Sequence, residues 1–405
     1  MTIIVMKFGG TSVADTSCIK NVAKKVQLQF KKTKKIVVVV SAMAGTTNKL
    51  IEHIADIDPF YNSQEYDVVV SSGEQITAGL LAIALKNLGI TARSWMGWQI
   101  PIITDKVYSK ASIEDINVKL ILDSFLSGQV AIVPGFQGIN KDNLITTLGR
   151  GGSDLSAVAL AAALKAHRCD IYTDVDGIYT ADPRMVPKAK KLDRISFEEM
   201  MEMASQGAKV LQTRSVAMAM RHNVRLRVLS SFDDGLGTLV ADEEEIMEKN
   251  IVSGIAFSLK EAKVTVLGIP DRPGQASKLF GQLAKKAINV DMIVQSSSAD
   301  GNETDLSFTV PELDINQAIL LIKEKQKEIG FKSIIEDKEV AKISVIGAGM
   351  QNQSGTAQKL FDTLAEKSIN LKVISTSEIK ISVLIDKSYM ELAVRSLHTA
   401  FDLDV

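Results

Sequence analysis

The sequence predicts an α/β protein with a mainly parallel sheet and helices on both faces, followed by two ferredoxin-like α+β modules. Two observations carry this prediction. Up to about Val240, short β-branched runs alternate with longer helical stretches, which is typical of βα units in a parallel sheet. Beyond that point, a segment of the chain repeats itself once. A chain of 405 residues is also too long for one ordinary core, so two or three domains are expected.

The elements of the first part follow from the spacing of apolar residues. The expected strands are Thr2–Phe8, Lys35–Ser41, Gln129–Pro134 and Cys169–Thr173. The expected helices are Thr16–Lys32, Ser72–Leu88 and Leu155–Ala166. In such sheets the ligand usually lies beyond the carboxyl ends of the strands, and each candidate motif below falls at a strand end.

The second part is a duplication. Gly274–Phe280 followed by Ile288–Val290 recurs as Gly355–Phe361 followed by Ile369–Leu371, an offset of 81 residues (274 to 355). A repeat of this length is a duplicated domain and not a short solenoid unit. Each copy has the pattern of a βαββαβ sandwich, and Asp300-Gly301-Asn302 supplies a hairpin turn in the first. The expected boundaries are 1–240 for the larger domain, 241–262 for a charged linker or entry helix, and 263–339 and 340–405 for the modules.

Composition excludes several classes of function. The 47 basic and 48 acidic residues leave a formal net charge of −1, so nothing indicates a nucleic-acid or membrane-surface partner. Cys18 and Cys169 lie far apart without a CxxC pair, which indicates free thiols in a reducing compartment. No targeting signal is visible, and apolar runs such as Ile36–Val40 are too short to span a bilayer, so a cytoplasmic location is expected.

The first turn, Lys7-Phe8-Gly9-Gly10-Thr11-Ser12, directly follows the first strand. Its glycines let backbone N–H groups approach an anion, a following helix favours negative charge, and Lys7 can neutralise phosphate oxygens. It is not a Walker A loop, because GxxxxGK[ST] occurs nowhere in the chain. Strand–Gly-Gly turns also occur without a ligand, so the turn alone predicts only that phosphate can bind.

A second motif, Gly149-Arg150-Gly151-Gly152-Ser153-Asp154, precedes a long apolar helix. In one interpretation, Ser153 or Asp154 caps that helix. In the other, an arginine among glycines captures a carboxylate or phosphate through a bidentate contact. Asp154 then orients donors around the phosphates or helps to position a metal.

Two further motifs carry acidic side chains. Thr173–Arg184 contains Asp174-Val175-Asp176-Gly177, but it lacks the third acid and the late Glu of a calcium loop, so a nucleoside pocket fits better. Ser71–Gln75 either starts a helix through a capping box or directs Glu74 toward the ligand edge of the sheet. The histidines have no ligand spacing, so no metal site is expected; they are His53, His167, His222 and His398.

Taken together and in this order, the motifs resemble those of the aspartate kinases in the amino-acid-kinase family, over essentially the whole chain. The duplicated tail resembles the paired ACT domains that bind amino-acid effectors in that family. The matching motifs are Lys7–Ser12, Val40–Met43, Ser72–Gln75, Gly149–Asp154, Thr173–Gly177 and Gln206–Leu211.

The resemblance implies transfer of the γ-phosphoryl group of ATP, with Mg²⁺, to the side-chain carboxylate of L-aspartate. The product is 4-phospho-L-aspartate, the first step toward lysine, threonine and methionine. A carboxylate nucleophile is already ionised at pH 7, so positioning and charge neutralisation can carry the reaction without a strong base.

The resemblance also implies roles for individual residues. Lys7, Asp154 and Lys209 would be catalytic. Glu74 would hold the substrate amino group, Thr47 and Arg150 its carboxylates, and Gly151, Gly152 and Ser153 would help to position it. The implied ATP contacts are Lys7, Phe8, Gly9, Gly10, Ser41, Thr173, Asp174, Tyr179, Arg184, Lys209 and Val210.

In the tail, the resemblance implies a pocket for lysine, threonine or both. Ser296 follows Gln295 where the family often has Asn, and Ser354 replaces a frequent proline, so the identity of the effector stays open. The candidate effector residues are Asp271, Gln275, Gln295, Asn370, Ser375, Thr376 and Glu378.

Two other functions stay open. A kinase of the same fold acting on acetylglutamate, glutamate or a nucleoside monophosphate is disfavoured by Glu74 and the paired modules. An inactive amino-acid sensor is disfavoured by intact Lys7, Arg150, Asp154 and Lys209. Small α+β modules with exposed sheet edges commonly pair with another chain, so a homodimer or higher oligomer through the C-terminal modules is expected.

Overall fold

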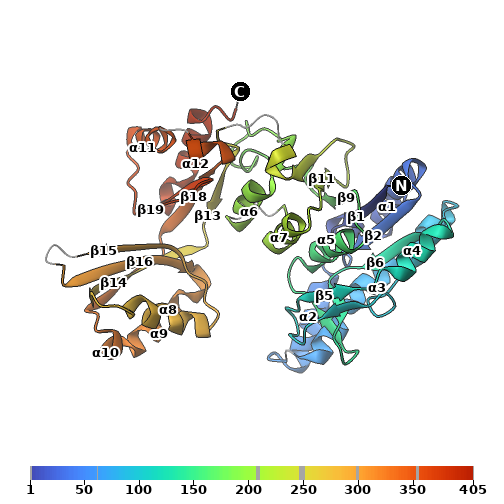
Figure 1. Cartoon of the computed structure of the whole chain (residues 1–405), viewed down its shortest axis with the longest axis horizontal. Coiled ribbons are helices and arrows are strands. Elements are labelled where there is room, and N and C mark those ends of the chain that lie inside the picture. Colours follow the sequence, from blue (N-terminus) through green and yellow to red (C-terminus); the bar gives the residue numbers. More distant parts are fainter. Residues whose placement is uncertain are drawn as a thin grey trace. The chain divides into compact units, whose positions relative to one another are not determined.

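The computed structural model describes residues 2–61, 63–206, 210–245, 251–297, 301–352 and 355–404. The chain divides into two compact units, drawn in Figure 1. The first unit holds Met1–Ile178, Lys191–Ala204 and Lys209–Glu248, and the second holds Tyr179–Lys190, Ser205–Ala208 and Lys249–Val405. The stretch Tyr179–Lys190, expected inside the larger domain of residues 1–240, therefore belongs to the second unit.

The first unit is built on an eight-stranded sheet. In spatial order, its strands are β10 (Arg194–Ser196), β12 (Thr238–Ala241), β11 (Leu226–Ser230), β9 (Arg168–Thr173), β1 (Ile3–Phe8), β2 (Lys35–Val40), β6 (Val130–Pro134) and β3 (Ala92–Ser94). The pairs from β11 through β9, β1, β2 and β6 to β3 are all parallel, and β12 is antiparallel to β11. The prediction of a mainly parallel sheet is confirmed.

Helices cover both faces of this sheet, as predicted. Ile4, Met6 and Phe8 of β1 point to one face and share a core with α1 and α3, while α5 packs on β1, β2 and β9 from the other face. The helices of this unit are α1 (Thr16–Lys32), α2 (Thr46–Ile57), α3 (Gln64–Asn87), α4 (Lys119–Leu126), α5 (Gly152–Ala163), α6 (Phe197–Ser205) and α7 (Thr213–Arg221).

Helix α1 has the predicted bounds because its start is encoded locally. The carboxylate of Asp15 accepts a hydrogen bond of 2.8 Å from the N–H of Cys18, which satisfies one of the unpaired amides of the first turn. Lys31 and Lys32 occupy the last turn, where positive charge is favourable.

Helix α3 corrects two expectations. It begins at Gln64, eight residues before the predicted start at Ser72, so Ser71 and Ser72 lie inside the helix and form no capping box. It is also long and apolar enough to cross a membrane by length and composition, with a mean hydropathy of 1.6 over its best window. Half of that window is buried inside the unit, and Asp67 and Glu74 are among its buried residues, which is typical of an interior helix.

A smaller four-stranded sheet, absent from the predicted elements, stands beside the main one. Its strands, in spatial order, are β5 (Ile113–Ile116), β4 (Ile102–Thr104), β7 (Gln137–Ile139) and β8 (Ile145–Thr147). Each is only three or four residues long, so no periodic pattern could reveal it. The hairpin β7–β8 leads directly into the Arg150 loop.

The first module of the second unit has the predicted βαββαβ order. Its elements are β14 (Glu261–Pro270), α8 (Gln275–Lys285), β15 (Asp291–Ser297), β16 (Glu303–Pro311), α9 (Ile315–Glu324) with the short α10 (Gln326–Ile329), and β17 (Ser333–Asp337). The sheet order is β15-β16-β14-β17, and all pairs are antiparallel. Of the expected hairpin turn, Asp300 lies outside the described residues.

The second module includes a strand that precedes the first module in the sequence, so the expected boundary of 340–405 is wrong. Its own elements are β18 (Val340–Ile346), α11 (Thr356–Glu366), β19 (Val373–Thr376), β20 (Lys380–Asp386) and α12 (Met390–Ala400). Its fourth strand is β13 (Gly254–Ser258), which pairs antiparallel with β18 and comes from the stretch 241–262 that was expected to be a linker. The first module is thus inserted between two parts of the second.

The excursion Tyr179–Lys190 packs on this second module. The N–H of Ile255 in β13 donates to the carbonyl of Thr180 over 2.7 Å, and the hydroxyl of Thr180 lies 2.9 Å from Nε2 of the buried His398. Ala181 and Val186 belong to the same hydrophobic core as β18 and α12.

The duplication is visible in the backbone as well as in the sequence. Helices α8 and α11 both start after a left-handed glycine, Gly274 (φ 93°) and Gly355 (φ 106°), at the predicted offset of 81 residues. Since only glycine adopts this conformation readily, both copies keep it.

Candidate active site

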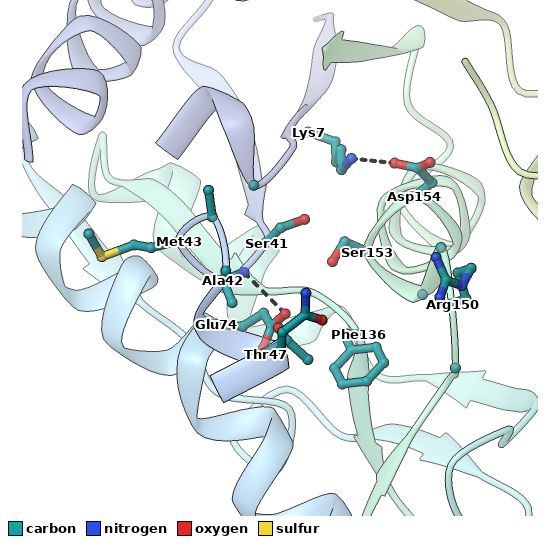
Figure 2. A pocket seen from close by; sticks show the side chains of 17 residues that line it. Lys7, Ser41, Ala42, Met43, Thr47, Glu74, Phe136, Arg150, Ser153 and Asp154 are labelled. Carbon is teal, nitrogen blue, oxygen red and sulfur yellow. Dashed lines mark hydrogen bonds and ion pairs between the residues drawn. The ribbon is translucent and has the colours of Figure 1, made fainter. Parts of the chain in front are cut away.

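The candidate catalytic residues Lys7 and Asp154 and the candidate substrate residues gather around one cavity of about 330 Å³ in the first unit (Figure 2). It lies beyond the carboxyl ends of β1, β2 and β6, where an open parallel sheet binds its ligands. Its lining is Lys7, Gly10, Ser41, Ala42, Met43, Ala44, Gly45, Thr47, Asn48, Glu74, Phe136, Gly149, Arg150, Gly151, Gly152, Ser153 and Asp154.

Lys7 and Asp154 form an ion pair at one end of the cavity. The Nζ of Lys7 lies 2.5 Å from Oδ1 of Asp154, and both side chains are about nine-tenths buried. The pair joins β1 to the first turn of α5 and faces Ser41 and Ser153 across the site in Figure 2. Because the pair is largely buried, the charges interact strongly, and Lys7 can bind an anionic ligand that enters the cavity in place of Asp154.

The glycine turn after β1 is tight but differs from the predicted arrangement. A Cβ on Gly10 would lie 3.2 Å from the carbonyl of Ala42, so glycine permits the close approach of the two strand ends. The N–H of Gly9 donates to the carbonyl of Tyr172 over 3.2 Å. A 3-10 turn (Thr11–Val13) and the capping Asp15 separate this loop from α1, so the dipole of α1 does not serve the turn as expected.

Glu74 marks the opposite end of the cavity. Its Oε1 accepts a hydrogen bond of 3.1 Å from the N–H of Ala42, while Oε2 is buried and has no hydrogen-bond partner in the described part of the chain. Burial raises the pKa of Glu74 to about 7, and the Ala42 N–H opposes this only in part. A buried carboxylate oxygen without a partner is costly, which points to a cationic or donor ligand at this position.

The start of α5 decides between the two interpretations of Ser153 and Asp154. The N-cap is Gly151, in the left-handed conformation (φ 75°), and no side chain caps the helix. Ser153 and Asp154 therefore line the cavity from the first turn, and the capping interpretation is wrong. A Cβ on Gly135 would lie 2.8 Å from that of Ser153, so this glycine lets the helix start approach the end of β6.

Two helix N-termini border the cavity. Helix α2 starts after Gly45, also left-handed (φ 77°), and its first turn carries Thr47. Arg150 is exposed on the loop before α5 and lines the cavity from the other side. Unpaired N–H groups and the helix dipoles favour anions at both positions, and Arg150 adds a full positive charge. This part of the site suits a ligand with two carboxylates.

The predicted nucleotide residues are not all brought together. Ser41 lines the cavity, whereas Phe8 is buried in the core and stacks on Tyr172 at 4.5 Å. Thr173 and Asp174 follow β9 and are hydrogen-bonded to each other at 3.0 Å. The remaining candidates lie elsewhere: Tyr179 and Arg184 in the second unit, Val210 away from the cavity lining, and Lys209 outside the described residues.

The candidate effector residues fall into two groups in the second unit. Asp271 and Gln275 lie at the junction of β14 and α8, where Nε2 of Gln275 donates to the carbonyl of Ile329 over 3.0 Å. The others lie on or next to β15 and β19, two strands that pack against each other: Gln295, Asn370, Ser375, Thr376 and Glu378.

Sequence reasoning missed Ala44, Asn48 and Phe136 among the side chains that line the cavity. Asn48 follows Thr47 in the first turn of α2, and the Gly45-Thr46-Thr47 helix start could have indicated it. Phe136 lies between β6 and β7 with a left-handed φ of 70°, a conformation uncommon for a bulky residue. No local sequence pattern predicts that Phe136 lines the cavity, because its position depends on the small sheet.

A second cavity of about 450 Å³ lies at the amino ends of β9 and β11. Its lining includes Arg225, which is already paired with Glu245 at 2.9 Å, and none of the predicted site residues. Among the described residues, no group of three His, Cys, Asp or Glu side chains has the arrangement of a metal site.

Comparisons with known proteins show which families the chain resembles. The family model described as the amino acid kinase family matches residues 2–230, and the ACT domain model matches residues 264–326 and 343–401. An aspartate kinase of Pseudomonas putida is 51% identical over 405 residues, covering 100% of this chain and 98% of that protein.

Solved structures agree as well. E. coli aspartokinase III in complex with aspartate and ADP (R-state) superposes with a TM-score of 0.82 at 27% identity, covering 98% of this chain and 99% of that one. The same enzyme in complex with lysine and aspartate (T-state) gives a TM-score of 0.78 at 26% identity, with 98% and 99% coverage.

Proposed function

Because the chain belongs to the amino acid kinase family and is an enzyme that phosphorylates L-aspartate, we propose that the 330 Å³ cavity is its substrate site. The observation that carries this assignment is the buried, unpartnered Oε2 of Glu74. A free α-ammonium group of an amino acid supplies the positive charge and the donors that this oxygen lacks. The solved structure of a relative bound to aspartate and ADP supports the choice of ligands.

The two carboxylates of aspartate bind at the anion-favouring side of the cavity. Arg150 holds one of them through a bidentate contact, and Thr47 with the start of α2 holds the other. Ser153, together with Gly151 and Gly152, positions the side-chain carboxylate toward Lys7. Anchoring the ammonium and both carboxylates fixes the orientation of the nucleophile.

Lys7, Gly9, Gly10 and Ser41 handle the phosphates of ATP. Lys7 lies between Asp154 and the place of the transferring group, where it neutralises charge on the γ-phosphoryl oxygens. Asp154 holds the lysine in place before ATP binds. Lys209 is assigned a similar role on its motif alone.

The reaction needs no proton transfer. An oxygen of the side-chain carboxylate attacks the γ-phosphorus, the bond from that phosphorus to the bridging oxygen breaks, and the electron pair leaves with ADP. The carboxylate is ionised at pH 7, so the chain contributes alignment and positive charge.

Mg²⁺ fits this site as a companion of ATP. It binds mainly to phosphate oxygens and water, so one nearby carboxylate such as Asp154 is enough. When bound, it neutralises phosphate charge.

Thr173 and Asp174 approach the nucleoside from the end of β9. The larger domain performs catalysis, and the paired modules bind lysine, threonine or both through Asp271, Gln275, Gln295, Asn370, Ser375, Thr376 and Glu378. The lysine-bound relative supports lysine as one effector. We further propose that the enzyme is cytoplasmic and forms a homodimer or higher oligomer through the paired modules.

One assay tests the function. Purified protein is incubated with Mg-ATP and a panel of amino acids, and acyl phosphate is trapped as hydroxamate. Hydroxamate that forms with aspartate, and not with glutamate or acetylglutamate, is expected. Its absence with aspartate would refute the assignment. In the same assay, lysine, threonine or both are expected to inhibit the formation of hydroxamate.

A further inference from the structure

Asp67 is a buried carboxyl group to which the proposed mechanism gives no role. It lies on α3, about two turns before Glu74, and its side chain is fully buried. Its Oδ2 accepts a hydrogen bond of 2.7 Å from the N–H of Thr147, and Oδ1 accepts one of 2.7 Å from the Thr147 hydroxyl. The N–H of Ser109 lies 3.0 Å from Oδ2. Neutral donors therefore satisfy both oxygens.

Burying a carboxylate against neutral donors alone is unusual. No lysine or arginine in the described ranges pairs with Asp67, whereas the other fully buried aspartate, Asp170, is held by Arg168 and Arg227. Hydrogen bonds to an ionised acceptor are strong and directional. Asp67 thus fixes the position of the backbone at Thr147 and Ser109 more rigidly than a neutral side chain would.

Those two points form the base of the Arg150 loop. Thr147 is the last residue of β8, and Arg150 follows three residues later. The carbonyl oxygen of Ser109 packs against the loop, since a Cβ on Gly149 would lie 2.9 Å from it. From the other side, the guanidinium of Arg214 donates to the carbonyls of Leu148 over 2.8 Å and Ala111 over 3.1 Å. The loop is held at its base while Arg150 itself is exposed.

We propose that Asp67 is a positioning residue for Arg150 and thereby sets the affinity of the enzyme for aspartate. The inference rests on the proposed role of Arg150 in holding a substrate carboxylate. Loss of the hydrogen bonds at Thr147 lets the loop base shift, which misplaces the guanidinium without touching the Lys7 end of the cavity. The effect falls on aspartate and not on ATP.

The experiment compares Thr147→Val with Thr146→Val in the full-length protein. Valine keeps the shape of threonine and removes one hydroxyl. The Thr147 hydroxyl bonds to Asp67, whereas that of Thr146, on the opposite face of β8, bonds to Thr104 over 2.6 Å. We expect Thr147→Val to lower kcat/KM for aspartate by about three- to tenfold, which is less than the full contribution of a hydrogen bond to a charged group because the N–H of Thr147 keeps its bond to Asp67. The KM of Thr147→Val for ATP should stay near the wild-type value, and its thermal midpoint should match that of Thr146→Val. The variants Thr147→Ser and Thr146→Val should keep wild-type values of kcat/KM for aspartate.

A cycle with Arg150→Ala separates positioning from general destabilisation. If Asp67 acts through Arg150, Thr147→Val and Asp67→Asn cause no further loss of kcat/KM for aspartate in the Arg150→Ala background. Full additivity there, or a wild-type rate for Thr147→Val while Arg150→Ala is impaired, overturns the inference. If Arg150→Ala alone keeps the wild-type value, the proposed role of Arg150 fails instead.

Discussion

The side chain of Lys7, at the end of β1, is joined to Asp154, in the first turn of α5, by a 2.5 Å ion pair. The two residues stand 147 positions apart (7 to 154), and only the parallel sheet brings them together. The pair holds the Lys7 side chain in place in a largely buried site. It also supplies the first prediction.

Replacement of Lys7 by alanine should lower kcat by about 10²–10³-fold, because a preorganised positive charge at the transferring phosphoryl group is lost. Lys7→Arg keeps the charge but changes its position, and it should recover only part of the rate. Lys20→Ala, on the exposed face of α1, serves as the control and should match the wild type. A wild-type kcat for Lys7→Ala in the hydroxamate assay would remove Lys7 from the mechanism.

The pKa of Glu74, raised to about 7 by burial, predicts a pH-dependent affinity for aspartate. Only the ionised form pairs with an ammonium group, so kcat/KM for aspartate should fall as the pH drops below about 7. Glu74→Gln should lower this parameter by about 10- to 100-fold at pH 8 and flatten its pH profile. Glu199→Gln, a change at another buried glutamate remote from the cavity, should leave the profile unaltered.

The same pKa shift predicts that Glu74 lowers stability. The pKa of Glu74 is higher in the folded state than in the unfolded state. The free energy of unfolding therefore keeps its full value at low pH and decreases as the pH rises from about 4.5 through about 7. Glu74→Gln should therefore unfold at a higher temperature than the wild type at pH 8, and the difference should vanish near pH 4. An equal midpoint at pH 8 in differential scanning calorimetry would contradict the shift.

The borrowed strand β13 should be needed for the second module. The pair Ala256–Ser344 lies in the middle of the β13–β18 ladder, so Ala256→Pro removes a backbone donor and disrupts the ladder, at a cost of about 1–3 kcal/mol. We expect faster amide exchange in β18 and a lower unfolding temperature, with Ala256→Ser as the control. Unchanged protection of β18 would show that β13 contributes little.

An ion pair between the two modules should respond asymmetrically to mutation. Lys342 of β18 is buried and bonds to Asp291 of β15, whose side chain is about half exposed. Asp291→Asn leaves a buried ammonium without its partner and should cost about 3 kcal/mol, whereas Lys342→Met leaves an aspartate that water can reach and should cost less. Urea unfolding of both variants measures the difference, and equal losses would refute the argument.

The parts of the fold that local chemistry encodes were predictable. The bounds of α1 follow from Asp15 at its start and its apolar stripe, and the duplication follows from identical glycine starts at Gly274 and Gly355. The prediction for α3 failed at its start because the stretch before Ser72 has neither a capping side chain nor a clear apolar stripe. The small sheet was missed because strands of three or four residues carry no period.

The candidate site divides in the same way. The sequence by itself determined which residues carry charge and hydroxyl groups at strand ends, because glycine turns and their flanking Lys7, Arg150 and Asp154 are contiguous in the chain. Only the tertiary structure decided that Ser153 faces the cavity instead of capping a helix, that β13 joins the second module, and that Asp67 holds the base of the Arg150 loop. These relationships join residues far apart in sequence, and their energies depend on burial and on donor geometry, which no local pattern contains.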